Sequence, residues 1–385
     1  MTLAVAPLFG TVERLNRSII TVKQALLRLH RFKAHPMDDF SPPTHITSDY
    51  IEIVFLFIVF ALGTSLNAVV LFRTIKDYVR NTTSLHQKNV KTGHLLFKIH
   101  LMVTNLLVLL SYCPLKIVWL VTYEWHFEDF GCRFINFAWM AAFCLASNMV
   151  TSIAIDRAII FRRLINAQEN GRGLMIGGAS YMRLVHWLTG GSYVLAFVCS
   201  APQLFLWRQY VFVYDGGEWA QCVSEWQLID ACNQLGCIYQ QSSIAAVVSR
   251  MTYAVYHTLI VFWLPFIVII ICYTIIISRL VSHSCSRVLL TRETVALSNS
   301  INSEHKGRIH VWRGQMRSRI FRTAAAVVLC YSICWLPYNV VTLAAELYRD
   351  LVPALADVEF LKWFILINAV TNPLIYACQN EKKVG

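Results

Sequence analysis

Charged residues are scarce in this chain: Asp, Glu, Lys and Arg make up 15% of its 385 residues, whereas 56% are hydrophobic. Soluble globular domains devote about a quarter of their residues to charge, so a water-soluble fold is disfavoured. HExxH and GxSxG patterns are absent, and His100, His186 and His257 are scattered without an obvious carboxylate or nucleophile partner. We therefore expect no catalytic residue, no metal site and no cofactor.

The charges are also unevenly spaced, which leaves long apolar segments between them. Seven segments contain no Asp, Glu, Lys or Arg, namely 53–72, 99–115, 134–155, 184–207, 251–278, 323–345 and 363–380. About 20 uncharged helical residues cross the hydrocarbon core of a bilayer. The second segment is short but continues past Lys116 to Tyr123, so we expect a helix bent at Pro114 with one embedded lysine. The sequence predicts an all-α membrane protein, a bundle of seven transmembrane helices.

The distribution of positive charge predicts how this bundle is oriented. Lys and Arg are concentrated after spans one, three and five, whereas Asp and Glu predominate after spans two, four and six. Cytoplasmic loops next to spans retain positive charge. We therefore expect the amino terminus outside and the carboxy terminus inside the cell. The net charge of +12 then belongs mainly to the cytoplasmic face and does not indicate a nucleic-acid partner.

We expect three parts: an extracellular tail (1–49), a seven-helix domain (50–378) with a long third cytoplasmic loop at about 281–316, and a short cytoplasmic tail (379–385). The first part contains basic residues typical of a cytosolic or targeting segment, but the acidic stretch at 35–52 favours export. Asn16 is then a candidate glycosylation site. The short carboxy terminus leaves open a tailless protein or a truncated form.

Short motifs occur at matching depths in several spans. They are Gly63-Thr-Ser-Leu-Asn67-Ala-Val-Val70, Asp156-Arg157-Ala158, Trp187, Pro265 with Tyr273, Cys334-Trp335-Leu336-Pro337-Tyr338 and Asn372-Pro373-Leu374-Ile375-Tyr376. Together they resemble the rhodopsin-like (class A) family of G-protein-coupled receptors. The resemblance implies a multi-pass receptor of the plasma membrane, embedded in the lipid bilayer, with an extracellular ligand and a heterotrimeric G protein as partners.

A closer resemblance is to the gonadotropin-releasing-hormone and adipokinetic-hormone receptor group. It rests on His100-Leu-Met-Val-Thr-Asn105-Leu-Leu, Ala201-Pro202-Gln203-Leu204, Gln221-Cys222-Val223 and an Asp-Arg pair without Tyr. This resemblance implies a peptide hormone or neuropeptide ligand and a Gq-type protein. The alternatives are a rhodopsin-like receptor for another peptide or a chemosensory ligand and, more distantly, a transporter or channel, for which an internal repeat of spans would be expected.

This chain differs from the related receptors in the polar core formed by Asn67 and Asn105. The related receptors accompany Asn in span two with Asp in span seven, whereas this chain has Asn372 there and Ala146 in place of the usual serine of span three. Without a carboxylate, a monovalent cation has no charged ligand in a medium of low dielectric constant. We therefore expect no sodium site, and the subgroup resemblance is weaker for it.

The family resemblance assigns further roles. It implies a disulfide between Cys132 and Cys222; Cys232 and Cys237 form a second bridge or remain two free thiols. Arg157 beside Asp156 is either a charge that reaches toward the lipid headgroups or the contact to the G protein, which we favour, together with Tyr273 and Tyr376. The acidic partner usual in span six is replaced by Arg317. Pro337, Asn372 and Pro373 are the expected activation switch with Trp335, whose simpler interpretation is a bulky core aromatic.

The expected ligand contacts lie near the outer ends of the spans. They are Lys116, Trp119, Trp139, Phe143, His257, Tyr338, Asn339 and Lys362. Trp139 stands where amine receptors carry an aspartate, so an amine ligand is disfavoured. In the related hormone receptors the position of Lys116 is an acid, so the charge is reversed here. Either Lys116 and Lys362 face the cavity and meet a ligand carboxylate, or they reach the headgroups or pair with Glu346 or Glu359.

Overall fold

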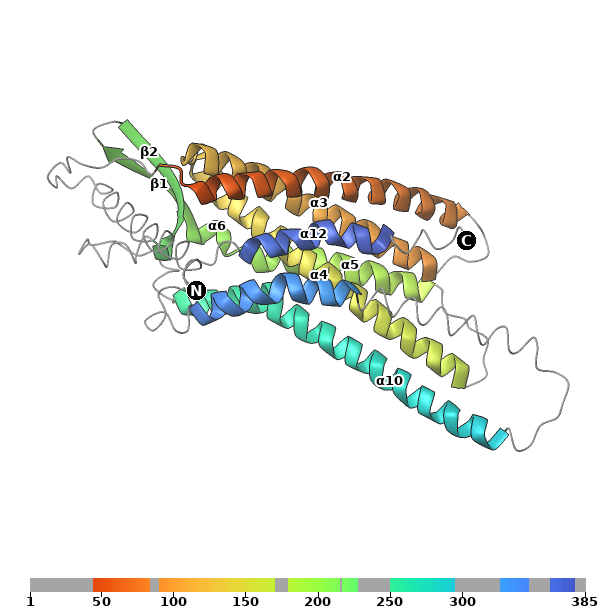
Figure 1. The fold of residues 1–385 in the computed structure, drawn as a ribbon. Coiled ribbons are helices and arrows are strands. Elements are labelled where there is room, and N and C mark those ends of the chain that lie inside the picture. The colour runs from red at the N-terminus through yellow and green to blue at the C-terminus, as the bar shows by residue number, and fades with distance from the viewer. Residues whose placement is uncertain are drawn as a thin grey trace, which may run out of the picture.

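The computed structural model describes residues 44–83, 90–169, 179–214, 217–227, 250–294, 326–345 and 361–377. Long helices lie side by side along one direction, and a two-stranded antiparallel sheet lies at one end of them (Figure 1). We call this the hairpin end of the bundle. Asp156 and Arg157 of helix α4 lie at the opposite end. We call it the Arg157 end.

The helices agree with the uncharged segments of the sequence. They are α2 (Thr47–Thr83), α3 (Val90–Thr122), α4 (Glu128–Glu169), α5 (Ala179–Ser200), α9 (Arg250–Thr258), a π-helical turn η1 (Leu259–Trp263), α10 (Leu264–Thr294), a helix Ala326–Ala345 that Figure 1 draws in lighter blue, and α12 (Leu361–Ala377). Among the described residues, six helical stretches are long and apolar enough to cross a membrane. With α12 as the seventh helix, the predicted all-α bundle is confirmed.

Span two is one continuous helix that contains both Pro114 and Lys116. The expected passage of this helix through its proline and lysine is therefore confirmed. In span five, α10 continues beyond the uncharged segment to Thr294. The first residues of the segment at 281–316, which we assign to the third cytoplasmic loop, are thus a helical extension of span five.

Span four contains a turn within its uncharged segment. The segment continues to Trp207 and the candidate span covers Ser180–Leu206, but α5 itself ends at Ser200, and a turn at Ala201 and Pro202 follows it. Proline has no amide hydrogen for the helical ladder and disfavours helical geometry in the residue before it. A short helix α6 (Gln203–Leu206) follows this turn and leads into strand β1 (Trp207–Tyr214).

The sheet is a hairpin of β1 and β2 (Gly217–Ser224), in which Gln209 pairs with Cys222. The backbone amide of Trp125, in the turn between α3 and α4, donates a hydrogen bond of 2.9 Å to the carbonyl of Ala220 in β2. This contact attaches the hairpin to the ends of the spans. Strand β2 therefore lies over the mouth of the bundle.

Span five contains the π-helical turn η1 directly before Leu264 and Pro265. Pro265 lacks the amide hydrogen that an α-helix would direct to the carbonyl of Val261, so the preceding turn adopts a wider hydrogen-bond pattern. The turn joins α9 to α10 without interrupting the span. It sets the direction in which the side chains of α9 point.

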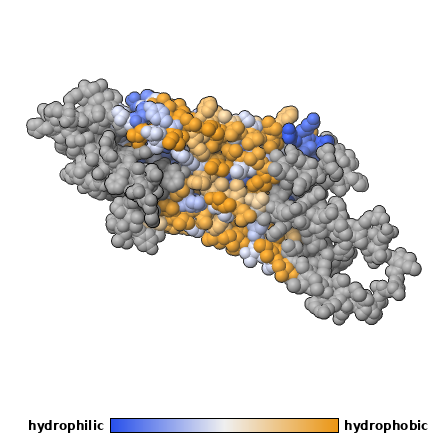
Figure 2. All heavy atoms as spheres, viewed as in Figure 1, coloured by the Kyte–Doolittle hydropathy of each residue, from blue (hydrophilic) through white to orange (hydrophobic). Residues whose placement is uncertain are grey.

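On the face shown in Figure 2, apolar side chains form a broad band across the middle of the bundle. Large apolar side chains are exposed on the helices, among them Phe57, Phe72 and Val198 with exposed fractions of 64%, 72% and 65%. Water would solvate such a surface poorly, and lipid tails cover it without cost. Helix α4 lies at the centre of the bundle, because 72% of its apolar span is buried against 28% in α2.

The orientation of the bundle is testable at the hairpin. An epitope tag inserted between Tyr214 and Gly217 should be stained on intact cells, because the acidic segments on this side are expected outside. A reporter fused after Gly385 should read cytoplasmic, which serves as the paired control. Flow cytometry before and after permeabilisation measures both; staining of the hairpin tag only after permeabilisation would overturn the orientation.

Candidate functional site

A cavity of about 560 Å³ lies at the hairpin end of the bundle, enclosed by α3, α4, α9, the helix Ala326–Ala345, α12 and the strand β2. Its volume is typical of sites for small ligands or for one end of a peptide. The structure brings all eight predicted ligand contacts together in its wall: Lys116, Trp119, Trp139, Phe143, His257, Tyr338, Asn339 and Lys362. Their role in binding stays a prediction.

The deep part of the cavity is aromatic. Trp335 is 1% exposed and packs edge-on against Phe143, with ring centroids 6.2 Å apart. Tyr112 tilts against Trp139 at 4.9 Å, and the indole N–H of Trp139 donates to the carbonyl of Ser111 at 3.1 Å. A rigid aromatic floor can pack against apolar or aromatic ligand groups.

Two lysines of the cavity lie over aromatic rings. The ammonium of Lys116 is 4.9 Å from the ring centroid of Trp119, and that of Lys362 is 6.0 Å from the ring of Tyr338. Both lysines line the cavity, as the first of the two interpretations requires. Glu346 and Glu359, the partners in the alternative, lie outside the described residues.

The sequence did not reveal several other residues of the wall. Arg250 and Tyr253 reach the cavity from α9, and Gln203 and Trp226 reach it from the segments around the hairpin. Gln203 and Tyr253 share a hydrogen bond, and Tyr253 stacks on Trp226 with centroids 4.6 Å apart. Gln203 belongs to the Ala201-Pro202-Gln203-Leu204 motif that carries the subgroup resemblance, whereas Arg250, Tyr253 and Trp226 belong to no quoted motif.

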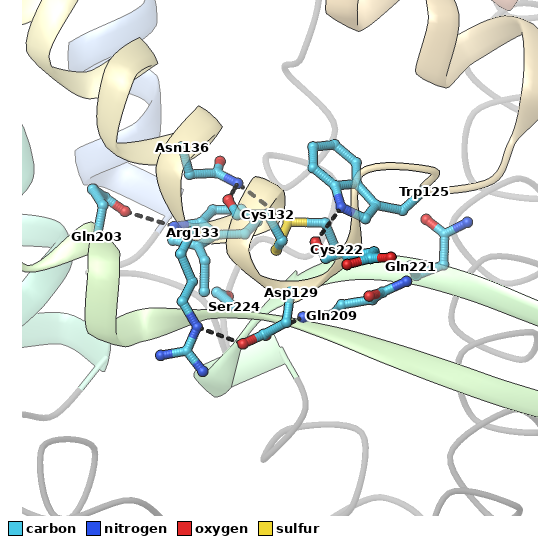
Figure 3. The surroundings of a disulfide bond; sticks show 12 residues. Trp125, Asp129, Cys132, Arg133, Asn136, Gln203, Gln209, Gln221, Cys222 and Ser224 are labelled. Carbon is cyan, nitrogen blue, oxygen red and sulfur yellow. Dashed lines mark hydrogen bonds and ion pairs between the residues drawn. A yellow bond between two sulfur atoms is a disulfide. The ribbon is translucent and has the colours of Figure 1, made fainter.

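The predicted disulfide between Cys132 and Cys222 is formed and links the start of α4 to strand β2 (Figure 3). Asn136, one turn further along α4, donates to the carbonyl of Cys132 at 2.8 Å and lies 3.2 Å from the sulfur of Cys222. The bond therefore holds β2 against the cavity. Cys232 and Cys237 lie outside the described residues.

Next to the disulfide, a hydrogen bond to Asp129 attaches the hairpin to α4 at a second point. Arg133 donates to a carboxylate oxygen of Asp129 at 2.7 Å, and the other oxygen accepts the backbone amide of Gln209 at 3.0 Å (Figure 3). Arg133 is partly exposed, so the pair itself contributes little. Its effect is to orient Asp129 toward strand β1.

Below the cavity, one polar contact ties α4 to the helix Ala326–Ala345. The hydroxyls of Ser147 and Tyr331 share a hydrogen bond of 2.6 Å, and both residues are fully buried. The ring of Tyr331 stacks on Trp335 at 5.4 Å. The contact between Ser147 and Tyr331 therefore connects α4, directly below the cavity floor, to the helix that contains Pro337.

The polar core between α2, α3 and α12 consists of neutral asparagines. Asn105 donates to Asn67 at 3.0 Å, and Asn67 donates to the carbonyls of Gly63 and Ala369, each at 2.8 Å. Asn372 is buried, and its side-chain amide has no hydrogen-bond partner among the described residues. Pro373 follows it inside α12. The Asn105 side chain and the two carbonyls around Asn67 supply dipoles but no formal charge.

At the Arg157 end, Asp156 and Arg157 are buried within the bundle. The two side chains lie 3.9 Å apart, and Asp156 accepts a hydrogen bond of 2.9 Å from the hydroxyl of Tyr181. The guanidinium of Arg157 also contacts the ring nitrogen of His94 on α3. Arg157 is 6% exposed, so it does not extend outward to the headgroups. Arg317 lies outside the described residues.

Two tyrosines complete this end. Tyr273 on α10 and Tyr376 on α12 are both buried. The ammonium of Lys98, a residue counted among the loop charges in the sequence, is 5.2 Å from the ring centroid of Tyr376. Sequence reasoning missed Lys98, His94 and Tyr181, because nothing in their local pattern shows which span they face.

Comparison with known proteins agrees with this geometry. The model of a family described as "7 transmembrane receptor (rhodopsin family)" matches residues 82–376. "G-protein coupled receptor daf-38" of Caenorhabditis elegans is 25% identical over 87% of this chain and 90% of its own. The gonadotropin-releasing hormone receptors of Bos mutus grunniens (24% identical, 89% of this chain and 92% of theirs) and Mus musculus (23%, 87% and 90%) are similar too. This chain belongs to the rhodopsin family of seven-transmembrane G-protein-coupled receptors, which are signalling receptors and not enzymes.

Proposed function

We propose that the chain is a plasma-membrane receptor that binds an extracellular peptide in the cavity and activates a Gq-type heterotrimeric G protein at the Arg157 end. One observation carries the proposal: a cavity and a buried Asp156–Arg157 pair lie at opposite ends of one bundle. The helix that contains Pro337 supplies Trp335 and Tyr338 to the cavity wall, and its Tyr331 contacts Ser147 of α4, the helix that contains Arg157. A ligand that shifts this helix changes the surface presented near Arg157.

A peptide is supported by the similarity to receptors whose names specify gonadotropin-releasing hormone. The second candidate is a rhodopsin-like receptor for a different peptide or a chemosensory ligand. It is favoured by Lys116, whose positive charge lines the cavity where the hormone receptors that it resembles carry an acid. The two candidates share the cavity and the G-protein surface and differ only in the ligand.

The test is a screen of synthetic peptides on cells that express the full chain, with calcium and cyclic AMP recorded in parallel. A peptide that raises calcium through Gq is the expected result. Cells that express the Arg157→Ala variant serve as the matched control, since they keep the cavity and lose the proposed coupling residue. A cyclic AMP response alone would overturn the Gq assignment, and activity confined to non-peptide extracts would favour the second candidate.

The contact between Ser147 and Tyr331 provides a further prediction about the resting state. Tyr331 lies between Pro337 and the Arg157 end, so a pivot at the proline separates its hydroxyl from Ser147. Changing Tyr331 to Phe removes a hydrogen bond worth about 1 kcal/mol and keeps the ring, and we expect ligand-independent nucleotide exchange to rise about five-fold.

Ser147→Ala is the matched variant on the other helix. It should raise basal exchange to a similar degree, and the double variant should exceed neither single variant by much, because both remove one interaction. Unchanged basal exchange in Tyr331→Phe, or fully additive effects in the double variant, would refute this role.

A further inference from the structure

The wall of the cavity carries positive charge from three directions. Lys116 comes from α3, Arg250 from the first residue of α9 and Lys362 from the start of α12. No Asp or Glu is among the described residues that line it. Glu225 lies between two lining residues in the sequence but is buried outside the lining, and Asp129 pairs with Arg133.

Nine Trp, Tyr and Phe side chains line the same cavity. Aromatic faces attract cations through their quadrupole, and this attraction holds Lys116 over Trp119 and Lys362 over Tyr338. It leaves the charge of Lys116 in place beside apolar walls, where screening by water is weak.

Lys116 lies six residues before the end of α3 at Thr122, which corresponds to roughly 9 Å along the helix. Its ammonium lies beside Trp119 in the cavity wall. An ammonium in these apolar surroundings gains free energy from an anionic partner, since it has lost part of its hydration.

We propose, building on the receptor function proposed above, that the ligand inserts an acidic group, a carboxylate joined to an aromatic or apolar end, and that Lys116 binds this carboxylate. The nine aromatic side chains pack against the apolar part. A ligand with an amine at this end is rejected by like charge.

The test uses full-length receptor in nanodiscs of neutral phosphatidylcholine and three probes of one shape: indole-3-propionate, its amide, and tryptamine. Saturation-transfer NMR measures their binding. The acid should bind about ten-fold more tightly than the amide, the usual effect of a charge-assisted hydrogen bond, and tryptamine should bind weakest. Lys116→Gln should reduce affinity for the acid about ten-fold and leave the amide within about two-fold.

Arg133→Gln is the matched control, because it removes a positive charge at the same end of the bundle from a side chain outside the cavity lining. It should keep the preference for the acid. Lys116→Arg preserves the charge, so it should also keep the preference and shows whether a loss in Lys116→Gln reflects folding. Equal binding of acid and amide by the wild type, no binding of the acid, or equal losses for both probes in Lys116→Gln would overturn the inference.

The same nanodiscs, mixed with a Gq-type protein and the peptides of the screen, separate the two proposals. Nucleotide exchange driven by a peptide, without any preference for the acid, would refute the acidic ligand and leave the receptor function intact. A preference for the acid without exchange under any peptide would refute the peptide function and leave the anionic site intact.

Discussion

Changing Arg157 to Ala abolishes activation of the G protein and leaves ligand binding nearly unchanged; this is the largest effect that we expect. Arg157 lies 14 positions after Phe143 in α4, or roughly 21 Å along the helix from the cavity. Its guanidinium is held by Asp156 and His94, and an alanine leaves nothing there to bind the carbonyl groups of a partner helix. Nucleotide exchange measures activation, and radioligand or probe binding measures the cavity.

Two variants sharpen this experiment. Arg163→Ala removes an exposed positive charge from the same end of α4 and should retain most activation, because surface charges contribute little individually. Arg157→Lys keeps the charge but loses the planar fork of donors, so we expect an intermediate loss. Normal exchange in Arg157→Ala would show that coupling runs through other residues.

The second large effect concerns the disulfide. Replacing Cys132 or Cys222 by Ala should cost about 4 to 5 kcal/mol of stability, the chain-entropy value for a loop of this length, and most of the surface expression. The two residues are 90 positions apart in the sequence, and the bond holds β2 over the cavity. Flow cytometry measures surface expression, and thermal unfolding of the purified protein measures stability.

The double variant Cys132→Ala with Cys222→Ala should cost no more than either single change, because both remove the same bond. Cys199→Ala is the control, since Cys199 is a free, partly buried cysteine of α5. Normal surface expression and ligand response in both single variants would mean that the bond is dispensable.

The spacing of charges predicted the helices well, because a bilayer imposes one length on every span. It did not predict the breaks within them. The uncharged segment that continues to Trp207 contains a turn after Ser200, because Pro202 acts on the backbone without changing the hydropathy. The same limit applies to η1, whose five residues Leu259–Trp263 are as apolar as any α-helical turn.

The candidate site was predictable in part from the position of residues near the outer ends of the spans and from the family resemblance. All eight expected cavity residues line one cavity, and the Cys132–Cys222 pairing is present. Arg250 and His94 escaped notice because their contacts depend on how helices from distant parts of the sequence face one another. Helix ends carry many charges, and the sequence does not show which of them turn inward.

Because of the π-helical turn in span five, the number of residues in that span, more than their polarity, decides which side chains of α9 face the cavity. Tyr253 and His257 are one turn apart in α9 and both line the cavity, on the far side of η1 from Pro265. Each residue advances a helix by about 100°. Loss of a single residue between Leu259 and Trp263 would leave the span apolar and long enough to cross the bilayer, yet would rotate Tyr253 and His257 by that angle toward the lipid. A one-residue gap in an alignment of this span therefore indicates a different cavity wall, even where every remaining side chain is the same.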